Sequence, residues 1–337
     1  MLLAKKETKL IKLVKRTLGI IRKARVPFRS SKFSNHIYNN HVHLVLLVLK
    51  VLSDMSYQRF MEWIENFDGL WVVLGVDRVP HFTTIHKFAG RLGRRYLDIL
   101  VTVSSINGRN RVLVTGIDST GFELTNASYY YITVLERRRP TGKVGRPRKL
   151  RAVHRHLKAT FVTETRDQMI IAIRLRRGPD NDNKDFIPSY KKLSDLDDRP
   201  LRVVVADKGY DCEANHEYIR DELRAMSIIP PRKNRSSDYR TTGRYRREMR
   251  EGYSKRLYGQ RAKSETVNSV IKRKMGDDVR ACKCRYQNRE IYFKAIAYNV
   301  ERGLVIIIII GFLGSPGWPA PCPHLTGRRL SSCGAFL

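Results

Sequence analysis

The sequence predicts an α/β protein in which a mixed sheet is flanked by helices and preceded by a helical N-terminal region. Residues 41–106 carry apolar side chains at helical spacing, whereas from residue 111 onward short runs rich in valine and isoleucine alternate with helical segments. The run 201–206 (LRVVVA) is almost continuously apolar, as expected of a strand buried on both faces. Alternating strands and helices are typical of a sheet against which helices pack.

The individual elements follow from local patterns in chain order. In the N-terminal part, helices are expected at 42–52, 57–66 and 83–100, the last with Thr83 or Thr84 as its N-cap. Strands are expected at 111–117, 129–135, 159–163, 169–175, 201–206 and 227–230. Further helices are expected at 182–193, 215–226, around Glu265 and at 289–302, with a basic connector at 231–256.

These patterns divide the chain into four parts: a basic arm (1–40), a helical domain (41–106), a sheet-containing domain (107–302) and an atypical tail (303–337). The basic arm carries an apolar helical stripe that fits either a packed helix or a DNA-contacting arm. The helical domain fits either a DNA-binding domain or a scaffold without base contacts. The sequence leaves both choices open.

The charge of the chain indicates a polyanionic partner. Lysine and arginine total 65, against 32 aspartate and glutamate residues, which gives a formal net charge of +33 over 337 residues. Nucleic acid is the expected partner rather than a membrane surface, because the positive charge is spread along the chain instead of being confined to one helix. The hydrophobic content of 42% is sufficient for a folded core.

The apolar runs and the cysteines bear on the compartment. The longest apolar runs, 42–52 and 304–313, are short for a bilayer span, and no signal peptide is recognisable, so no membrane partner is expected. The five cysteines are odd in number and sparsely spaced, which favours neither a disulfide framework nor a structural zinc site. We therefore expect a protein of the reducing cytoplasm that associates with nucleoid DNA.

One segment, 258–272, combines an apolar side with a side rich in reactive groups. Tyr258, Arg261, Glu265 and Lys272 stand at positions i, i+3, i+7 and i+14, which on a helix fall within an arc of roughly 60°. The opposite side of the helix carries Val267, Val270 and Ile271. A carboxylate flanked by cations on a packed helix, in a very basic protein, suggests a metal-dependent enzyme that acts on phosphates.

Two aspartates stand where predicted strands end. Asp118 follows the run 111–117 and Asp207 follows the run 201–206, so both carboxylates can emerge from the sheet beside Glu265. Like charges at such close range repel each other unless divalent cations neutralise them, and two Mg²⁺ ions about 3.5–4 Å apart meet this requirement. Taken singly, Asp118 fits a turn residue and Glu265 fits a surface salt bridge with Arg261.

A second candidate for DNA contact is the basic, proline-punctuated loop at 137–151. Its residues 145–149 (GRPRK), which include Arg146 and Arg148, resemble the core of a minor-groove AT-hook. The alternative is a solvated charge run, because short basic motifs are common.

The constellation as a whole resembles a known family. Asp118, Asp207 and Glu265 look like the DDE triad of insertion-sequence transposases with an RNase H-like catalytic domain. The spacing from Tyr258 through Arg261 and Glu265 to Lys272 resembles the Tyr-Arg-Glu-Lys signature of the insertion-sequence-4-type group, which the 5-type group shares in looser form. The segment 207–211 (DKGYD) resembles the sequence that these families carry around the second aspartate.

The resemblance implies a fold, an activity and partners. It implies an RNase H-like catalytic domain over 107–302 that cuts transposon ends and joins them to target DNA with Mg²⁺ or Mn²⁺, bound as two ions by the three acids. Tyr258, Arg261 and Lys272 would hold the DNA backbone near those ions. Double-stranded DNA, comprising inverted repeats and target, would be the partner of a homodimer that brings two ends together.

Two other functions remain compatible with these residues. One is a nuclease or resolvase of the same fold, and the other is a non-catalytic DNA-binding protein derived from a transposase. Only 57 residues, 208 to 264, separate the second and third acids, which leaves little room for the large β-strand insertion of some family members. The processing of the cleaved end, by hairpin or otherwise, is therefore left open.

Overall fold

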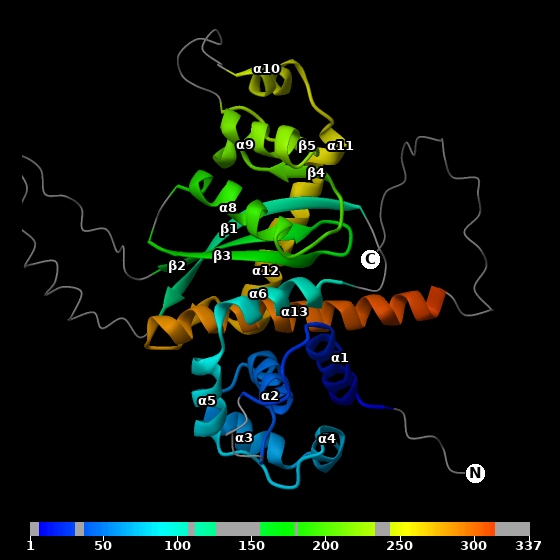
Figure 1. The fold of residues 1–337 in the computed structure, drawn as a ribbon, viewed down its shortest axis with the longest axis vertical. Coiled ribbons are helices and arrows are strands. Elements are labelled where there is room, and N and C mark those ends of the chain that lie inside the picture. The colour runs from blue at the N-terminus through cyan, green and yellow to red at the C-terminus, as the bar shows by residue number, and fades with distance from the viewer. Residues whose placement is uncertain are drawn as a thin grey trace, which may run out of the picture.

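The computed structural model describes residues 7–30, 37–106, 112–125, 156–178, 181–232 and 243–313 (Figure 1). The expected strand at 129–135, the basic loop with Arg146 and Arg148, and the tail beyond residue 313 lie outside the described residues. Within these ranges, no helix combines the length and apolar character needed to cross a bilayer.

A mixed sheet forms the centre of the protein, with helices against it (Figure 1). Its strands run in the order β3-β2-β1-β4-β5, and the short β6 pairs with the far end of β1. Strand β2 is antiparallel to β1 and β3, whereas β4, β5 and β6 are parallel to their neighbours. The strands are β1 (Leu113–Leu124), β2 (His156–Glu164), β3 (Met169–Arg177), β4 (Leu201–Ala206), β5 (Met226–Ile228) and β6 (Asp278–Val279). This arrangement confirms the predicted α/β class, an RNase H-like mixed sheet flanked by helices.

The N-terminal part before the sheet is helical, as predicted. Its helices are α1 (Lys9–Lys23), α2 (Asn40–Ser53), α3 (Tyr57–Glu65), α4 (Asp68–Leu74), α5 (Phe82–Arg91) and α6 (Arg94–Ser104). The sequence did not predict α4. The single helix expected at 83–100 is wrong, because Leu92 and Gly93 adopt extended backbone angles and separate α5 from α6. The residue at the N-cap of α5 is His81, whose ring hydrogen bonds the Thr83 hydroxyl at 2.8 Å.

The second half supplies the helices that cover the sheet. They are α8 (Asn183–Ser194), α9 (Glu213–Glu217), α10 (Arg244–Glu251), α11 (Lys255–Tyr258), α12 (Ala262–Met275) and α13 (Cys284–Leu313). The helix expected at 215–226 is shorter than predicted and continues as a π-helical turn over Tyr218–Glu222. The basic connector expected at 231–256 contains α10.

Helix α13 lies between the sheet and the N-terminal helices, so both share one hydrophobic core (Figure 1). Helix α1 packs against α2 and α13 and buries Leu13, Val14 and Ile21 of its apolar stripe. The basic arm therefore contains a packed helix, which was one of its two interpretations. Burial of this stripe removes apolar surface from water, which stabilises the attachment of α1.

Alternation along β1 sends successive side chains to opposite faces of the sheet. Leu113 and Ile117 enter a core with residues of α8 on one face. Val114, Gly116 and Asp118 face the other side, which α12 covers along β1 and β2. This second face carries the predicted acids.

Candidate active site

Asp118 lies inside β1 and not at its end, which corrects the sequence prediction. The strand extends to Leu124 because β2 pairs with it along this whole stretch, with Asp118 opposite Phe161. On the other edge of β1, pairing with β4 ends at Ile117 opposite Ala206. Asp118 is therefore the first β1 residue beyond the end of β4, so its carboxylate still emerges where the sheet opens.

Asp207 directly follows the last residue of β4, as predicted. Because Ile117 pairs with Ala206 in parallel register, the next residues of the two strands, Asp118 and Asp207, stand side by side. Val203 and Val205 of β4 pack beneath α11, and alternation gives Asp207 the same face. The Asp207 side chain is 50% exposed.

Glu265 lies in the first turn of α12, which packs closely on β1. A Cβ atom at Gly116 would clash with the hydroxyl oxygen of Ser264, so the missing side chain at Gly116 permits this close approach. Ser264 is buried, whereas Glu265 is half exposed at 51%. The missing side chain at Gly116 therefore leaves room for Ser264 and lets the turn that carries Glu265 lie close to β1.

Asn268 is a site residue that the sequence prediction missed. Its Nδ2 group donates a hydrogen bond of 2.9 Å to Asp118 Oδ2, while the Ser119 backbone N–H donates to Asp118 Oδ1, also at 2.9 Å. The signal that could have revealed it is its position three residues after Glu265, one turn further along the same helix. Asn268 Oδ1 is buried and has no hydrogen-bond partner among the described residues.

The environment of Asp118 disfavours its charged form. Burial is the main cause and raises the pKa of Asp118 from 3.8 to about 6, and the nearby negative charge of Glu265 acts in the same direction. The Ser119 N–H, the Arg261 charge and the Asn268 amide partly oppose this rise. A nearby cation would stabilise the ionised form of a carboxyl group with such a pKa.

Arg261 is a cation that lies between two of the three acids, Glu265 and Asp207. Its Nη1 atom lies 2.8 Å from Glu265 Oε1 and 3.9 Å from Asp207 Oδ1. Burial by itself would lower the pKa of Arg261, but the charges around it, which include Asp118, more than offset this and raise the pKa. The surface salt bridge considered for Glu265 is thus present, and it belongs to a cluster around one guanidinium group.

The acids fit a hard divalent cation by donor type, although their side chains are not arranged as a finished metal site. Across the described ranges, no three His, Cys, Asp or Glu side chains lie close enough together to hold a metal ion. Carboxylate oxygens are the ligands that Mg²⁺ and Mn²⁺ prefer. Since Asp207 and Glu265 are half exposed, their side chains can turn toward an ion once Arg261 gives way.

The other predicted DNA-contacting residues occupy different parts of the same helical segment. A 3-10 turn over Gly259–Arg261 separates α11 from α12, which corrects the single continuous helix expected there. The ring of Tyr258 lies 5.9 Å from the Arg261 guanidinium carbon and thus joins the cluster. Lys272 lies seven residues after Glu265, about 10 Å along the helix, with its Nζ 5.6 Å over the Phe122 ring.

The segment 207–211 is held in place by structural contacts. The hydroxyl groups of Tyr210 and Ser119 share a hydrogen bond of 2.8 Å, which ties the turn after β4 to β1. The buried carboxylate of Asp211 accepts a hydrogen bond of 2.7 Å from Arg246 of α10. These contacts anchor the backbone on both sides of Asp207.

Comparison with known proteins identifies the family to which the chain belongs. Among solved structures, it is similar to the piggyBac transposase in a synaptic complex with hairpin DNA, at 11% identity and a TM-score of 0.39, over 93% of this chain and 80% of that chain. No curated protein sequence matches it. The family model described as a transposase DDE domain matches residues 113–300, from the start of β1 into α13. Because this match spans more than half of the 337 residues, the chain belongs to the family of DDE-domain transposases, enzymes that bind DNA, cleave it and transfer its strands.

Proposed function

We propose that Asp118, Asp207 and Glu265 are the catalytic acids of this DNA transposase. The observation that carries the proposal is the position of Arg261, whose guanidinium group lies 2.8 Å from Glu265 and 3.9 Å from Asp207, the residue that stands beside Asp118. The adjacent register of β1 and β4 and the close packing of α12 support the same assignment.

The three carboxylates would hold divalent metal, which DDE transposases generally use. Mg²⁺ or Mn²⁺, as two ions, fits the oxygen donors. Such ions, when bound, activate the attacking water or 3′-hydroxyl and stabilise the leaving oxygen. Asn268 would orient the Asp118 carboxylate, and the carboxylate would be ionised above pH 6, where it can act as a ligand.

Arg261 would have two tasks. In the metal-free protein it offsets the charge of Glu265 and Asp207, and with DNA present it would grip a backbone phosphate together with Tyr258 and Lys272. The loop residues Arg146 and Arg148 would extend this contact into a minor groove.

At the level of the whole protein, we propose a member of the insertion-sequence-4-type or related 5-type group. The helical domain (41–106) would bind DNA beside the catalytic domain (107–302), flanked by the basic arm (1–40) and the tail (303–337). A homodimer would bring two inverted repeats and target DNA together, in the cytoplasm and on the nucleoid. The Tyr258-to-Lys272 spacing and the charge of +33 support these assignments.

A plasmid assay tests the proposal. The substrate is a supercoiled plasmid that carries the gene with its native flanking DNA, with a second plasmid as target. The wild-type protein should excise the element and join it to the target only when Mg²⁺ or Mn²⁺ is present. Asp118→Asn, Asp207→Asn and Glu265→Gln should each abolish both steps and still bind DNA in a mobility-shift assay.

The controls separate this proposal from its two rivals. Glu251→Gln removes an exposed acid at the end of α10 and should keep full activity. Metal-dependent cutting without joined products would indicate a nuclease or resolvase, and DNA binding without any cutting would indicate a non-catalytic derivative. Activity retained in any of the three acid variants would overturn the residue assignment.

A further inference from the structure

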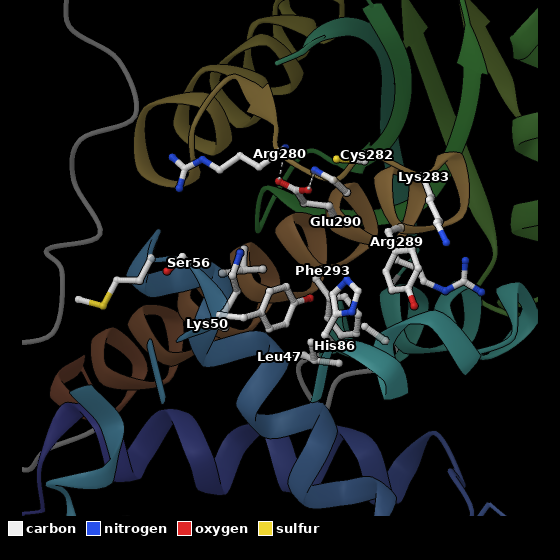
Figure 2. Close-up of a pocket in the computed structure, with 16 residues that line it drawn as sticks. Leu47, Lys50, Ser56, His86, Arg280, Cys282, Lys283, Arg289, Glu290 and Phe293 are labelled. Carbon is white, nitrogen blue, oxygen red and sulfur yellow. Dashed lines mark hydrogen bonds between the residues drawn. The ribbon is translucent and has the colours of Figure 1, made fainter. Parts of the chain in front are cut away.

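A cavity of about 440 Å³ lies among the N-terminal helices and α13, and none of the site residues described above lines it. Figure 2 shows its walls, with Leu47 and Lys50 from α2, His86 from α5, and Glu290 and Phe293 from α13. The loop between β6 and α13 closes one side. Its lining residues come from two parts of the chain, 47–89 and 280–293, that lie far apart in sequence, so the cavity exists only in the folded chain.

Aromatic rings form one wall of this cavity. The rings of His86 and Tyr286 stack with centroids 4.4 Å apart and an angle of 1° between their planes. Tyr57 meets His86 edge-on, with centroids 5.3 Å apart. A Cβ atom at Gly90 would clash with the Tyr286 hydroxyl, so α5 holds this ring closely in place. The outer face of this stacked pair is a surface of the kind on which a planar heterocycle can stack.

A lysine, Lys50, lines the same cavity (Figure 2). The Nζ atom of Lys50 lies 5.0 Å over the Tyr57 ring, and among the described residues no hydrogen bond or ion pair joins Lys50 to a carboxylate. Burial lowers the pKa of Lys50, and the nearby charges of Glu290, Asp54 and Asp278 oppose this shift only in part. An anionic group of a ligand would stabilise the charged form of this ammonium group.

Glu290, Asp54 and Asp278 act on this ammonium group through their negative charge, but among the described residues none of them lies within ion-pair distance of it. Glu290 is the acid in the lining, and its carboxylate accepts the backbone N–H groups of Arg280 and Ala281 at 3.2 and 3.1 Å. Arg280 is itself paired with Asp54. At the exposed rim, Lys283 adds another positive charge.

We infer that this cavity binds one nucleotide, with its base on the His86–Tyr286 platform and its phosphate at Lys50 and Lys283. The combination of an aromatic wall with a half-buried lysine that lies beyond ion-pair distance of any carboxylate among the described residues matches a ligand that is planar at one end and anionic at the other. The volume suits a single nucleotide and excludes a duplex about 20 Å across. The nucleotide belongs either to an unpaired stretch of a DNA strand or to the free pool, and both present the same base and phosphate.

Fluorescence of 2-aminopurine tests this inference, because stacking on aromatic rings quenches it. The probes are 2-aminopurine deoxyriboside 5′-monophosphate and a single-stranded hexamer with one central 2-aminopurine, each titrated at physiological salt with a chelator present. Wild-type protein should quench at least one probe saturably. Lys50→Met should weaken that binding about tenfold, and Lys283→Gln should weaken it several-fold.

Matched controls keep the outcome interpretable. Lys87, next to His86 on α5, is exposed and does not line the cavity. The affinity of the Lys87→Met variant for each probe should therefore stay within about twofold of the wild-type value. Lys283 is exposed, so its variant remains informative should Lys50→Met fail to fold. Saturable quenching of both probes assigns the site to free nucleotides, whereas quenching of the hexamer alone assigns it to a DNA strand.

Two results would overturn the inference. One is the absence of saturable quenching with either probe, and the other is equal binding by wild type, Lys50→Met and Lys283→Gln. The measurement uses neither metal nor strand cleavage, so its outcome is independent of the assignment of Asp118, Asp207 and Glu265.

Discussion

Arg261 lies one helical turn before Glu265, and its Nη1 atom is 2.8 Å from the Glu265 carboxylate. The same atom is 3.9 Å from Asp207, so a protein cation holds the position between two proposed metal ligands. A fixed positive charge is an alternative to a metal ion for offsetting repulsion between carboxylates. Arg261 and metal ions are therefore expected to compete for these acids.

The variant Arg261→Gln tests this competition. Without the guanidinium group, repulsion among the acids should lower the free energy of unfolding by about 0.5–1 kcal/mol in the presence of a chelator, because the pair is partly exposed. Mn²⁺ should then raise the melting temperature of the variant more than that of wild type. Equal metal-induced shifts in the two proteins would show that Arg261 does not compete.

Asp118→Asn should stabilise the protein at neutral and alkaline pH. The folded-state pKa of about 6 exceeds the ordinary value of 3.8, so the native state binds more protons than the unfolded state between these values, and the free energy of unfolding falls as pH rises through that window. The variant should gain about 1–3 kcal/mol over wild type above pH 7 and show little difference at pH 4. Denaturant titrations at both pH values measure this, and a less stable variant at pH 8 would refute the argument.

Gly116→Ala should separate α12 from β1. Its Cβ would clash with the Ser264 hydroxyl, and relief of that clash should cost about 1–3 kcal/mol of stability and displace Glu265, with loss of strand cleavage. Gly121→Ala, on the same strand, is the matched control, because no neighbouring atom lies within 4 Å of the new Cβ. Equal stability and activity of the two variants would contradict the packing argument.

Asn268→Ala should shift the pH profile of cleavage. The Asn268 amide donates a hydrogen bond of 2.9 Å to Asp118 Oδ2, which favours the ionised carboxylate. Removal of the amide should therefore raise the pKa of Asp118 and move the acidic limb of the pH profile to higher pH. The expected loss at pH 6 is about tenfold, with partial recovery at pH 8. Ser269→Ala, on the exposed side of α12, should leave the profile unchanged. A uniform loss at all pH values would indicate a purely structural role.

Much of the fold could be predicted from local patterns. Strand β4 has the bounds 201–206 that were expected, and α3 and β3 begin at the expected residues, Tyr57 and Met169. These elements were predictable because uninterrupted apolar runs or helical stripes are bounded by residues that end them. The break between α5 and α6 was not predictable in this way, since the apolar spacing continues across Leu92 and Gly93.

The site was predictable in its residue types and only partly in its geometry. Asp207 follows its strand as expected, while Asp118 lies within a longer strand because β2 extends β1 beyond the apolar run. Gly116 and Asn268 escaped prediction, since their roles appear only when α12 is placed against β1. Sequence periodicity describes one element at a time and carries no information on its partner.

The sequence by itself determined which groups could do the chemistry: three acids, the spacing of Tyr258, Arg261, Glu265 and Lys272, and a surplus of positive charge. These depend on composition and on spacing within single elements, which short-range geometry governs. Only the tertiary structure decided that Asn268 supports Asp118 across 150 residues of chain, that Arg261 stands between Asp207 and Glu265, and that burial raises the pKa of Asp118. Hydrogen bonds, ion pairs and desolvation act over a few ångströms, so they exist only once folding has brought distant segments into contact.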